Sequence, residues 1–358
     1  MIRLNFMKRQ QYILTILLSR KNASSSEISE ILEEQGNGSS LITIKRELSL
    51  MIKSGLINRV GSGRSVKYEI SERGRLIADV DAKTYVTIDP DNRYGLRAYN
   101  FKLFESISGE MFSEKELNIL NEKTSRYLTL SKDVSPVIRE KELERFVIEL
   151  SWKSSKIEGN TYTLLDTEKL IKQGIEAVGH DKDESRMILN HKDAFKFVLE
   201  NVDSFKNLTL PSLEELHKII TKDMGVSKGL RSKPVGVVGS IYRPLDNVYQ
   251  IKEEVNNLCS VVSKIESPYL KAMIALLGIS YLQPFEDGNK RTSRLVANAI
   301  LLAFGCAPLS YRSVDENSYR EATLVFYELN SFQPFKKIFF EQYIFAVENY
   351  LVGGEALI

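Results

Sequence analysis

The chain has 358 residues, of which 43% are hydrophobic and 27% charged, with 49 basic and 47 acidic side chains. This is the composition of a globular protein long enough for two domains, and it excludes a largely disordered or fibrous chain. Its two cysteines offer neither a disulfide framework nor a metal-ligand spacing. No stretch reaches the roughly 20 apolar residues of a membrane span. The short apolar run near the N-terminus lacks a signal-peptide cleavage site, so we expect a cytoplasmic protein without a membrane partner.

The first 80 residues are basic, with 13 Lys and Arg against 8 Asp and Glu. A first helix is predicted over Tyr12–Ser19, a second after a capping box formed by Ser24 and Glu27, and a third after a Ser40 cap. A Gly-Ser-Gly turn at 61–63 and an alternating strand at 66–70 follow. Three helices and a hairpin in this order predict a winged helix-turn-helix domain over residues 1–80.

Basic side chains in this domain lie where a winged helix would meet DNA. Lys45 and Arg46 come early in the third helix, and Arg64 and Lys67 flank the hairpin turn. Such side chains can contact phosphates or base edges. DNA is therefore a candidate partner, the alternative being a protein-interaction module with ordinary solvated charges.

Residues 81–110 are predicted to be a connector between domains. A turn signal at 89–92 is followed by four aromatic residues, Tyr94, Tyr99, Phe101 and Phe104. A free linker would be polar, so we expect this segment to pack against one or both domains.

The most specific motif spans residues 283–294. An apolar run ends at Leu282, and a helical pattern follows over Leu295–Phe304. Between them, Gly288 and Asn289 precede two arginines, Arg291 and Arg294, which are spaced to project together from the first helical turn. This arrangement predicts a phosphate site at a helix N-terminus, with Asp287 beside it to hold Mg²⁺. The alternative is a capping loop with solvated charges.

The motif resembles the Fic-type (Fido) signature His-x-Phe-x-[Asp/Glu]-Gly-Asn-[Gly/Lys]-Arg-x-x-Arg, and the resemblance covers roughly residues 112–352. It implies a mainly α, all-helical core over 111–358 with a small β-hairpin flap. It also implies transfer of AMP from ATP to a Ser, Thr or Tyr hydroxyl of a target protein. The residues implied to bind the nucleotide phosphates are Gly288, Asn289, Lys290, Arg291 and Arg294, with Asp287 on Mg²⁺, and the implied flap residues are Val235, Gly236, Val237 and Val238.

Gln283 stands where the family has its general base, a histidine. A glutamine amide cannot take up and release a proton near neutral pH, and general-base catalysis contributes about 10²–10⁴-fold. The histidines, His180, His191 and His217, lie outside the motif and are interpreted as surface or satisfied helix residues. Lys290 replaces the commoner Gly and matches a phosphate-transferring branch of the family, Doc, so the transferred group stays open between AMP and phosphate.

A second motif resembles the inhibitory helix of Fic proteins, expected here over about 137–160. Ser154, Glu158 and Gly159 match its [Ser/Thr]-x-x-x-Glu-[Gly/Asn] pattern. The resemblance implies that Glu158 pairs with Arg294 and blocks placement of the γ-phosphate. The alternative is a helix C-terminus with Gly159 as a left-handed cap.

Two functions from different classes remain open. The first is an autoinhibited, ATP- and Mg²⁺-dependent adenylyltransferase or phosphotransferase that acts on a protein and is slowed by Gln283. The second is a DNA-binding regulator whose Fic-like domain senses a nucleotide or a partner without fast chemistry. Removal of a modification, with Glu158 positioning a water, ranks below both. A homodimer fits either function.

Overall fold

A computed structural model describes residues 8–107, 111–132 and 134–351. It divides into two compact units. The first contains the described residues up to Ile107 together with 236–243 and 321–335, and the second contains the remaining described residues. The chain therefore passes between the units several times instead of crossing at one boundary.

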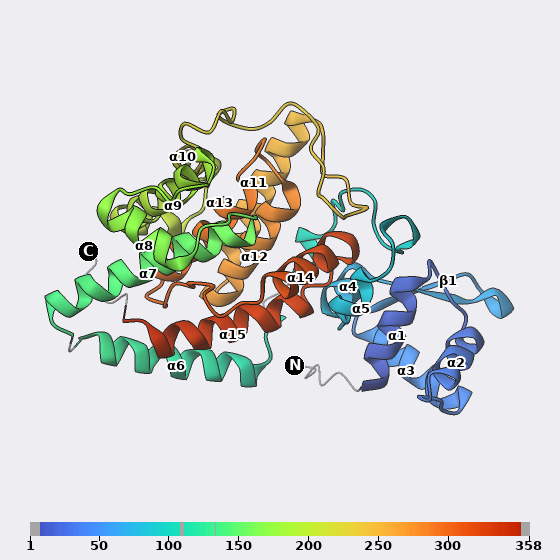
Figure 1. Ribbon diagram of the computed structural model, residues 1–358. Helices are drawn as coiled ribbons and strands as arrows, with labels where there is room; N and C mark the ends of the chain where they lie inside the picture. Colours follow the sequence, from blue (N-terminus) through green and yellow to red (C-terminus); the bar gives the residue numbers. More distant parts are fainter. Residues whose placement is uncertain (1–7, 108–110, 133, 352–358) are drawn as a thin grey trace. The chain divides into compact units, whose positions relative to one another are not determined.

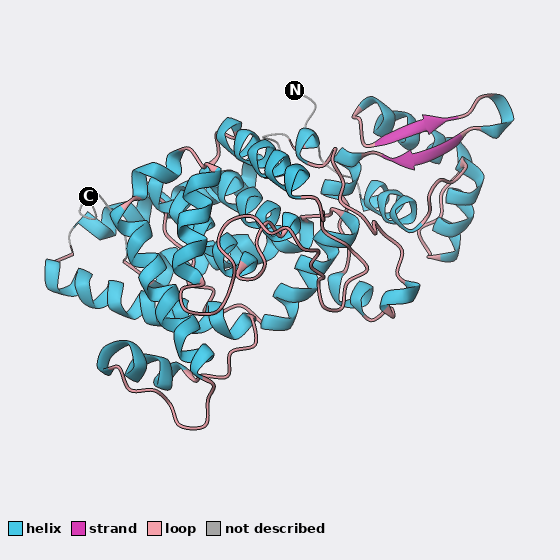
Figure 2. Ribbon diagram, turned by 90° about the horizontal axis from the view of Figure 1, so that it is seen from above, coloured by secondary structure: helices cyan, strands magenta, loops and turns pink. Residues whose placement is uncertain are grey.

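The first unit begins with three helices and a hairpin, the element order predicted from the sequence. The elements are α1 (Lys8–Ser19), α2 (Ser25–Glu34), α3 (Leu41–Lys53), β1 (Ile57–Val60) and β2 (Lys67–Ile70). The predicted capping box is present, with Ser24 N donating to Glu27 Oε2 over 2.6 Å and Glu27 N donating to Ser24 Oγ over 3.3 Å. The strands pair antiparallel, with Ile57 opposite Ile70 (Figure 2).

Short helices α4 (Glu72–Ile77) and α5 (Ala82–Val86) follow in the same unit. Beyond them the connector is fixed by the fully buried carboxylate of Glu328. Tyr85 Oη and Ser240 Oγ each donate to it over 2.7 Å, and Arg93 Nη1 lies 3.3 Å away. Ile241 N donates over 3.2 Å. The segment is therefore a packed part of this unit, in agreement with its aromatic content.

The second unit is built from helices. They are α6 (Glu114–Lys132), α7 (Pro136–Ile157), α8 (Leu164–Gln173), α9 (Lys182–Glu200), α10 (Leu210–Ile220), α11 (Val248–Lys264), α12 (Pro268–Leu282) and α13 (Asn289–Ala303). The chain ends with α14 (Glu316–Leu329), which begins in this unit, and α15 (Gln333–Asn349).

Helices α12 and α13 form the centre of this unit, surrounded by α7, α9, α10 and α11 (Figure 1). Every residue of α12 from Tyr269 to Leu282 is buried, as its largely apolar sequence leads one to expect. Gly278 allows α11 to approach closely, because a Cβ there would lie 2.5 Å from Leu258 Cδ1. The loop that joins α12 to α13 is thus held between two buried helices.

The predicted flap, residues 235–238, contains no strand. Residues 235–238 are irregular and enter a turn at Val238 and Gly239, without the strands expected for a hairpin flap. The side chain of Val238 is 99% exposed.

Within residues 8–107, 111–132 and 134–351, no helix combines the length and apolar character needed to cross a bilayer.

Candidate functional site

The loop between α12 and α13 begins with a left-handed residue at Gln283. Its φ of 48° ends α12, and its side-chain Nε2 donates to Ser280 O over 2.6 Å. The loop ends at Gly288, the N-cap of α13, whose φ of 77° is also left-handed. A Cβ at Gly288 would also lie 2.9 Å from Thr221 Cγ2. Both the dihedral angle and the packing therefore require glycine at this position.

The side chain of Asn289 closes the loop. Its Oδ1 accepts from Phe285 N over 2.8 Å, and its Nδ2 donates to Phe285 O over 2.8 Å and to Gln283 Oε1 over 3.1 Å. The amide is thereby used inside the loop. An anion at this point would be met by the backbone N–H groups of the first turn of α13, which have no intrahelical acceptor.

Positive charge is concentrated at the start of α13. The guanidinium groups of Arg291 and Arg294 are both buried, and the helix N-terminus carries the positive end of the peptide dipoles. Arg291 Nη2 lies 3.0 Å from Asp287 Oδ2. The buried cations and free amides together form an anion-binding geometry.

Asp287 is the residue predicted from the sequence to hold Mg²⁺. Its side chain is 65% exposed. The described residues contain no cluster of three His, Cys, Asp or Glu side chains that would form a protein-only metal cage. Mg²⁺ is commonly bound by one or two carboxylates together with substrate phosphates. A single exposed carboxylate at the edge of a phosphate site fits that kind of binding.

Arg294 is occupied by the C-terminal end of α7. Its Nη1 lies 2.8 Å from Glu158 Oε1, its Nε donates to Ser154 Oγ over 2.9 Å, and its Nη2 donates to Ser154 O over 2.8 Å. The Tyr319 ring lies 5.7 Å from the guanidinium carbon. The structure therefore brings the two sequence motifs together at one arginine.

Glu158 is the C-cap of α7, and Gly159 follows with a φ of 100°. The second carboxylate oxygen of Glu158, Oε2, lies 3.6 Å from Lys290 Nζ. Burial disfavours the charged carboxylate, but the positive charges of Arg294 and Lys290 outweigh it, so the pKa of Glu158 lies below its usual value. The carboxylate is accordingly an anion at neutral pH. It is paired with a guanidinium, a group whose geometry also suits phosphate oxygens.

Further contacts that sequence reasoning missed hold the end of α7. Lys153 Nζ lies 2.5 Å from Glu316 Oε1. Arg320 Nε donates to Ile157 O over 3.0 Å, next to the Glu158 cap. No local pattern links these positions, which lie more than 160 residues apart in the sequence. They fix the C-terminal end of α7 from the side of α14.

Two histidines are also more central than their sequence positions indicate. His217 stacks on Phe285 with ring centroids 3.8 Å apart, and its Nε2 lies 2.8 Å from Asp287 O. Burial lowers the pKa of His217. His191 is fully buried in α9, and burial together with the charges of Arg294 and Arg291 lowers its pKa. Both therefore belong to the packing around the motif. His217 is the satisfied helix residue that the sequence allowed, whereas neither ring nitrogen of the buried His191 has a hydrogen-bond partner among the residues that the structure describes.

The start of the predicted flap is tied to the motif loop within the second unit. Arg231 N donates to Pro284 O over 3.0 Å, and Arg231 Nε donates to Gln283 O over 2.6 Å. Residues 236–243 group instead with the first unit, through Ser240 and the Glu328 carboxylate. Arg231 therefore fixes the segment before the flap to the motif loop.

The predicted DNA-contacting side chains are all exposed. Lys45 and Arg46 lie on the outer side of α3, while Ile44 and Leu48 of the same helix are buried. Arg64 lies in the turn of the hairpin, and Lys67 begins β2. The four side chains are therefore available to a partner.

Residues 207–301, which include the motif loop, match the model of the Fic/DOC family. This part of the chain is therefore similar to the Fic/DOC family. Curated relatives named "Protein adenylyltransferase Fic" include one from Drosophila mojavensis, 26% identical over 254 residues, and one from Nematostella vectensis, 25% identical over 216 residues. These alignments cover 70% and 59% of this chain and 50% of each relative. The chain thus spans about half the length of the curated relatives it matches.

Solved structures agree on the Fic fold. Fic-1 from C. elegans superposes with a TM-score of 0.55 at 19% identity, covering 66% of this chain and 70% of that one. A Fic family protein from Desulfovibrio desulfuricans G20 gives a TM-score of 0.55 at 21% identity, covering 66% and 74%. These similarities establish the mainly helical Fic-type fold of the chain.

Proposed function

We propose that this protein binds ATP with Mg²⁺ at the N-terminus of α13 and is held in an autoinhibited state by Glu158. The observation that carries the proposal is the occupation of the buried Arg294 guanidinium by Glu158 and Ser154. A carboxylate and a phosphate compete for the same charge-assisted hydrogen bonds. Release of Glu158 would leave Arg294 and the first-turn amides of α13 for the nucleotide phosphates.

The reaction we propose is slow transfer of AMP from ATP to a Ser, Thr or Tyr hydroxyl of a target protein. The hydroxyl oxygen bonds to the α-phosphorus, pyrophosphate leaves, and the hydroxyl proton passes to solvent. The names of the curated relatives support protein adenylylation. Mg²⁺ held by Asp287 would neutralise charge on the phosphates. Gln283 would supply no general base, because a carboxamide does not take up a proton near neutral pH, and its amide is already hydrogen-bonded to Ser280 O and Asn289. The target hydroxyl would therefore react without a positioned base. Lys290 keeps phosphate transfer open as the alternative reaction.

Parallel labelling with α- and γ-labelled ATP tests this proposal. The proteins are the wild type, Glu158→Ala and the double variant Glu158→Ala/Gln283→His. We expect little labelling of the wild type and more from the α-label in the double variant, because it combines a released phosphate site with an imidazole base. Labelling from the γ-label alone would indicate phosphate transfer. Equal labelling of all three proteins would contradict both autoinhibition and the role given to position 283.

A second function, DNA binding by residues 1–80, is favoured by the exposed basic side chains on α3 and the hairpin. We propose that Lys45, Arg46, Arg64 and Lys67 contact a duplex, which would make this a DNA-binding regulator with a nucleotide-sensing Fic domain. Binding to phosphates releases counterions and falls steeply with salt. Mobility shifts at increasing salt compare the wild type with Lys45→Ala/Arg46→Ala, and with Lys83→Ala as a control at an exposed lysine of α5. No shift at low salt, or an equal shift for all three proteins, would refute this proposal.

A further inference from the structure

Lys290 lies in the first turn of α13 and contacts the carboxylate that occupies the phosphate site. Its Nζ is 3.6 Å from Glu158 Oε2, while Arg294 Nη1 is 2.8 Å from Glu158 Oε1. One carboxylate therefore neutralises two cations, one through each oxygen. Both cations belong to the same helical turn, four residues apart.

The two cations differ in freedom to move. The Arg294 side chain is 0% exposed and is also bonded to Ser154 Oγ and Ser154 O. The Lys290 side chain is 35% exposed, and Glu158 is 18% exposed. A lysine is a point charge on a flexible four-carbon stem, whereas an arginine fork is fixed by its geometry. Lys290 is thus able to follow a negative charge that moves, and Arg294 is fixed in place.

We propose that Lys290 exchanges partners, binding the Glu158 carboxylate in the resting protein and a nucleotide phosphate once Glu158 has moved away. The inference rests on the proposed function, because it assumes that the nucleotide phosphates lie at the start of α13. Beyond the proposed function, the exchange means that two ion pairs of Glu158, with Arg294 and with Lys290, stabilise the resting state. Lys290 then also binds the nucleotide.

The charges around the first turn of α13 support this exchange. Arg291 is already paired with Asp287 over 3.0 Å. Displacing Glu158 would leave Lys290 and Arg294 without their carboxylate, beside the positive end of the helix. A triphosphate supplies several negative oxygens at one place and satisfies both cations together. The loss of two ion pairs is thereby offset by the ligand.

If Lys290 exchanges partners, the effect of Lys290→Ala on nucleotide affinity depends on whether Glu158 is present. In the absence of Glu158, this change removes only a phosphate contact and weakens nucleotide binding. In the presence of Glu158, it also loosens the resting state, and this second effect strengthens binding. The two effects oppose each other in the wild-type background alone.

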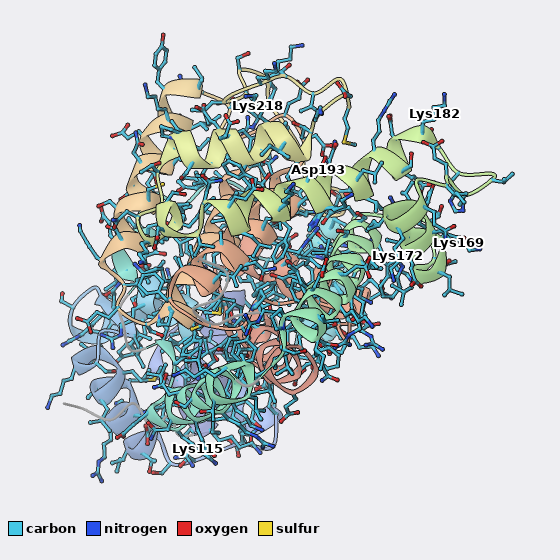
Figure 3. All side chains as sticks on the ribbon, turned by 90° about the vertical axis from the view of Figure 1, so that its left-hand side faces the viewer. Lys115, Lys169, Lys172, Lys182, Asp193 and Lys218 are labelled. Atoms are coloured by element: carbon cyan, nitrogen blue, oxygen red, sulfur yellow. The ribbon has the colours of Figure 1, made fainter. Side chains whose placement is uncertain are left out.

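Calorimetric titration with Mg·ATP tests the exchange in the wild type, Lys290→Ala, Glu158→Ala and the double variant. An ion pair that is partly exposed contributes up to about fivefold in an equilibrium constant. We therefore expect Lys290→Ala to weaken binding about fivefold in the Glu158→Ala background, and to weaken it less, or strengthen it, in the wild-type background. Lys218→Ala, at a lysine that projects from α10 and pairs with Glu215, is the matched control and is expected to change neither (Figure 3).

Thermal unfolding of the same four proteins without nucleotide provides an independent measurement. The midpoint losses caused by Lys290→Ala and Glu158→Ala are expected to be less than additive, because each change removes the same ion pair. Additive losses, or equal fold-changes in affinity in both backgrounds, would overturn the exchange and leave the proposed function standing. If no variant binds Mg·ATP, the proposed function is overturned, and with it the proposal that Lys290 binds a phosphate. Thermal unfolding of the four proteins would still show whether Lys290 and Glu158 form a stabilising ion pair.

Discussion

Replacing Glu158 by alanine is expected to increase the affinity for Mg·ATP. The residue is the C-cap of α7, with φ −89° and ψ 5°, which alanine adopts without strain. The change therefore removes the carboxylate and leaves the backbone free to keep its path. Arg294 retains its two hydrogen bonds to Ser154, so the guanidinium stays in position for a phosphate.

The size of the effect follows from the interaction that the ligand no longer has to break. A hydrogen bond to a charged group contributes about 1.5–3 kcal/mol. The Arg294–Glu158 ion pair, at 2.8 Å with the arginine fully buried, is taken to be of the same order. Because about 1.4 kcal/mol corresponds to a factor of ten, we expect the dissociation constant to fall by about 10- to 100-fold.

Isothermal titration with Mg·ATP measures this change directly. Glu140→Ala is a suitable control, since Glu140 is an exposed glutamate on the same helix. An affinity of Glu158→Ala within twofold of the wild type, with Glu140→Ala also unchanged, would refute competition between Glu158 and the nucleotide.

Three further predictions concern the loop, the connector and pH. Gln283→Ala removes an acceptor from Asn289 and is expected to lower the free energy of unfolding by about 0.5–1.5 kcal/mol in urea titrations; no loss would show that this bond is not needed. Glu328→Ala leaves Arg93 buried without its carboxylate and is expected to cost about 3–5 kcal/mol in the same assay, whereas a loss below 1 kcal/mol would contradict the connector's packing. The lowered pKa of His191 means that its contribution to stability is complete above its usual pKa of 6.5 and is lost as pH falls toward the lowered value. The thermal midpoint is therefore expected to drop less between pH 7.5 and 5.5 in His191→Gln than in the wild type, and equal drops would count against this explanation.

Local signals in the sequence predicted much of the structure. The Ser24 capping box, the Ser40 cap and the hairpin are all present. Each depends on residues within a few positions of one another, so the pattern and its physical cause are both readable in the chain. The Gly288-Asn289 pair and the apolar pattern after it likewise predicted a helix beginning in this region, and α13 starts at Asn289.

Contacts between distant segments could not be predicted in this way. The sequence indicated that Gln283 cannot act as a general base. It did not indicate that the Gln283 side chain would accept a hydrogen bond from Asn289. The stacking of His217 on Phe285 joins residues 68 positions apart, and no periodicity reports such a pair. The pairing of Glu158 with Arg294 was expected only through the resemblance, since the two residues are far apart in the chain.

The Glu328 carboxylate has a consequence for where this protein could be divided. The region that matches the Fic/DOC family ends at residue 301, and a fragment starting at residue 111 would retain the complete phosphate motif and α7. It would also retain Glu328 but lose Tyr85 and Arg93, two of the groups that satisfy this buried anion. The smallest fragment expected to fold on its own is therefore larger than residues 207–301, which match the family. An exchange of N-terminal domains between relatives would have to preserve the 85–93 segment to yield a soluble, folded hybrid.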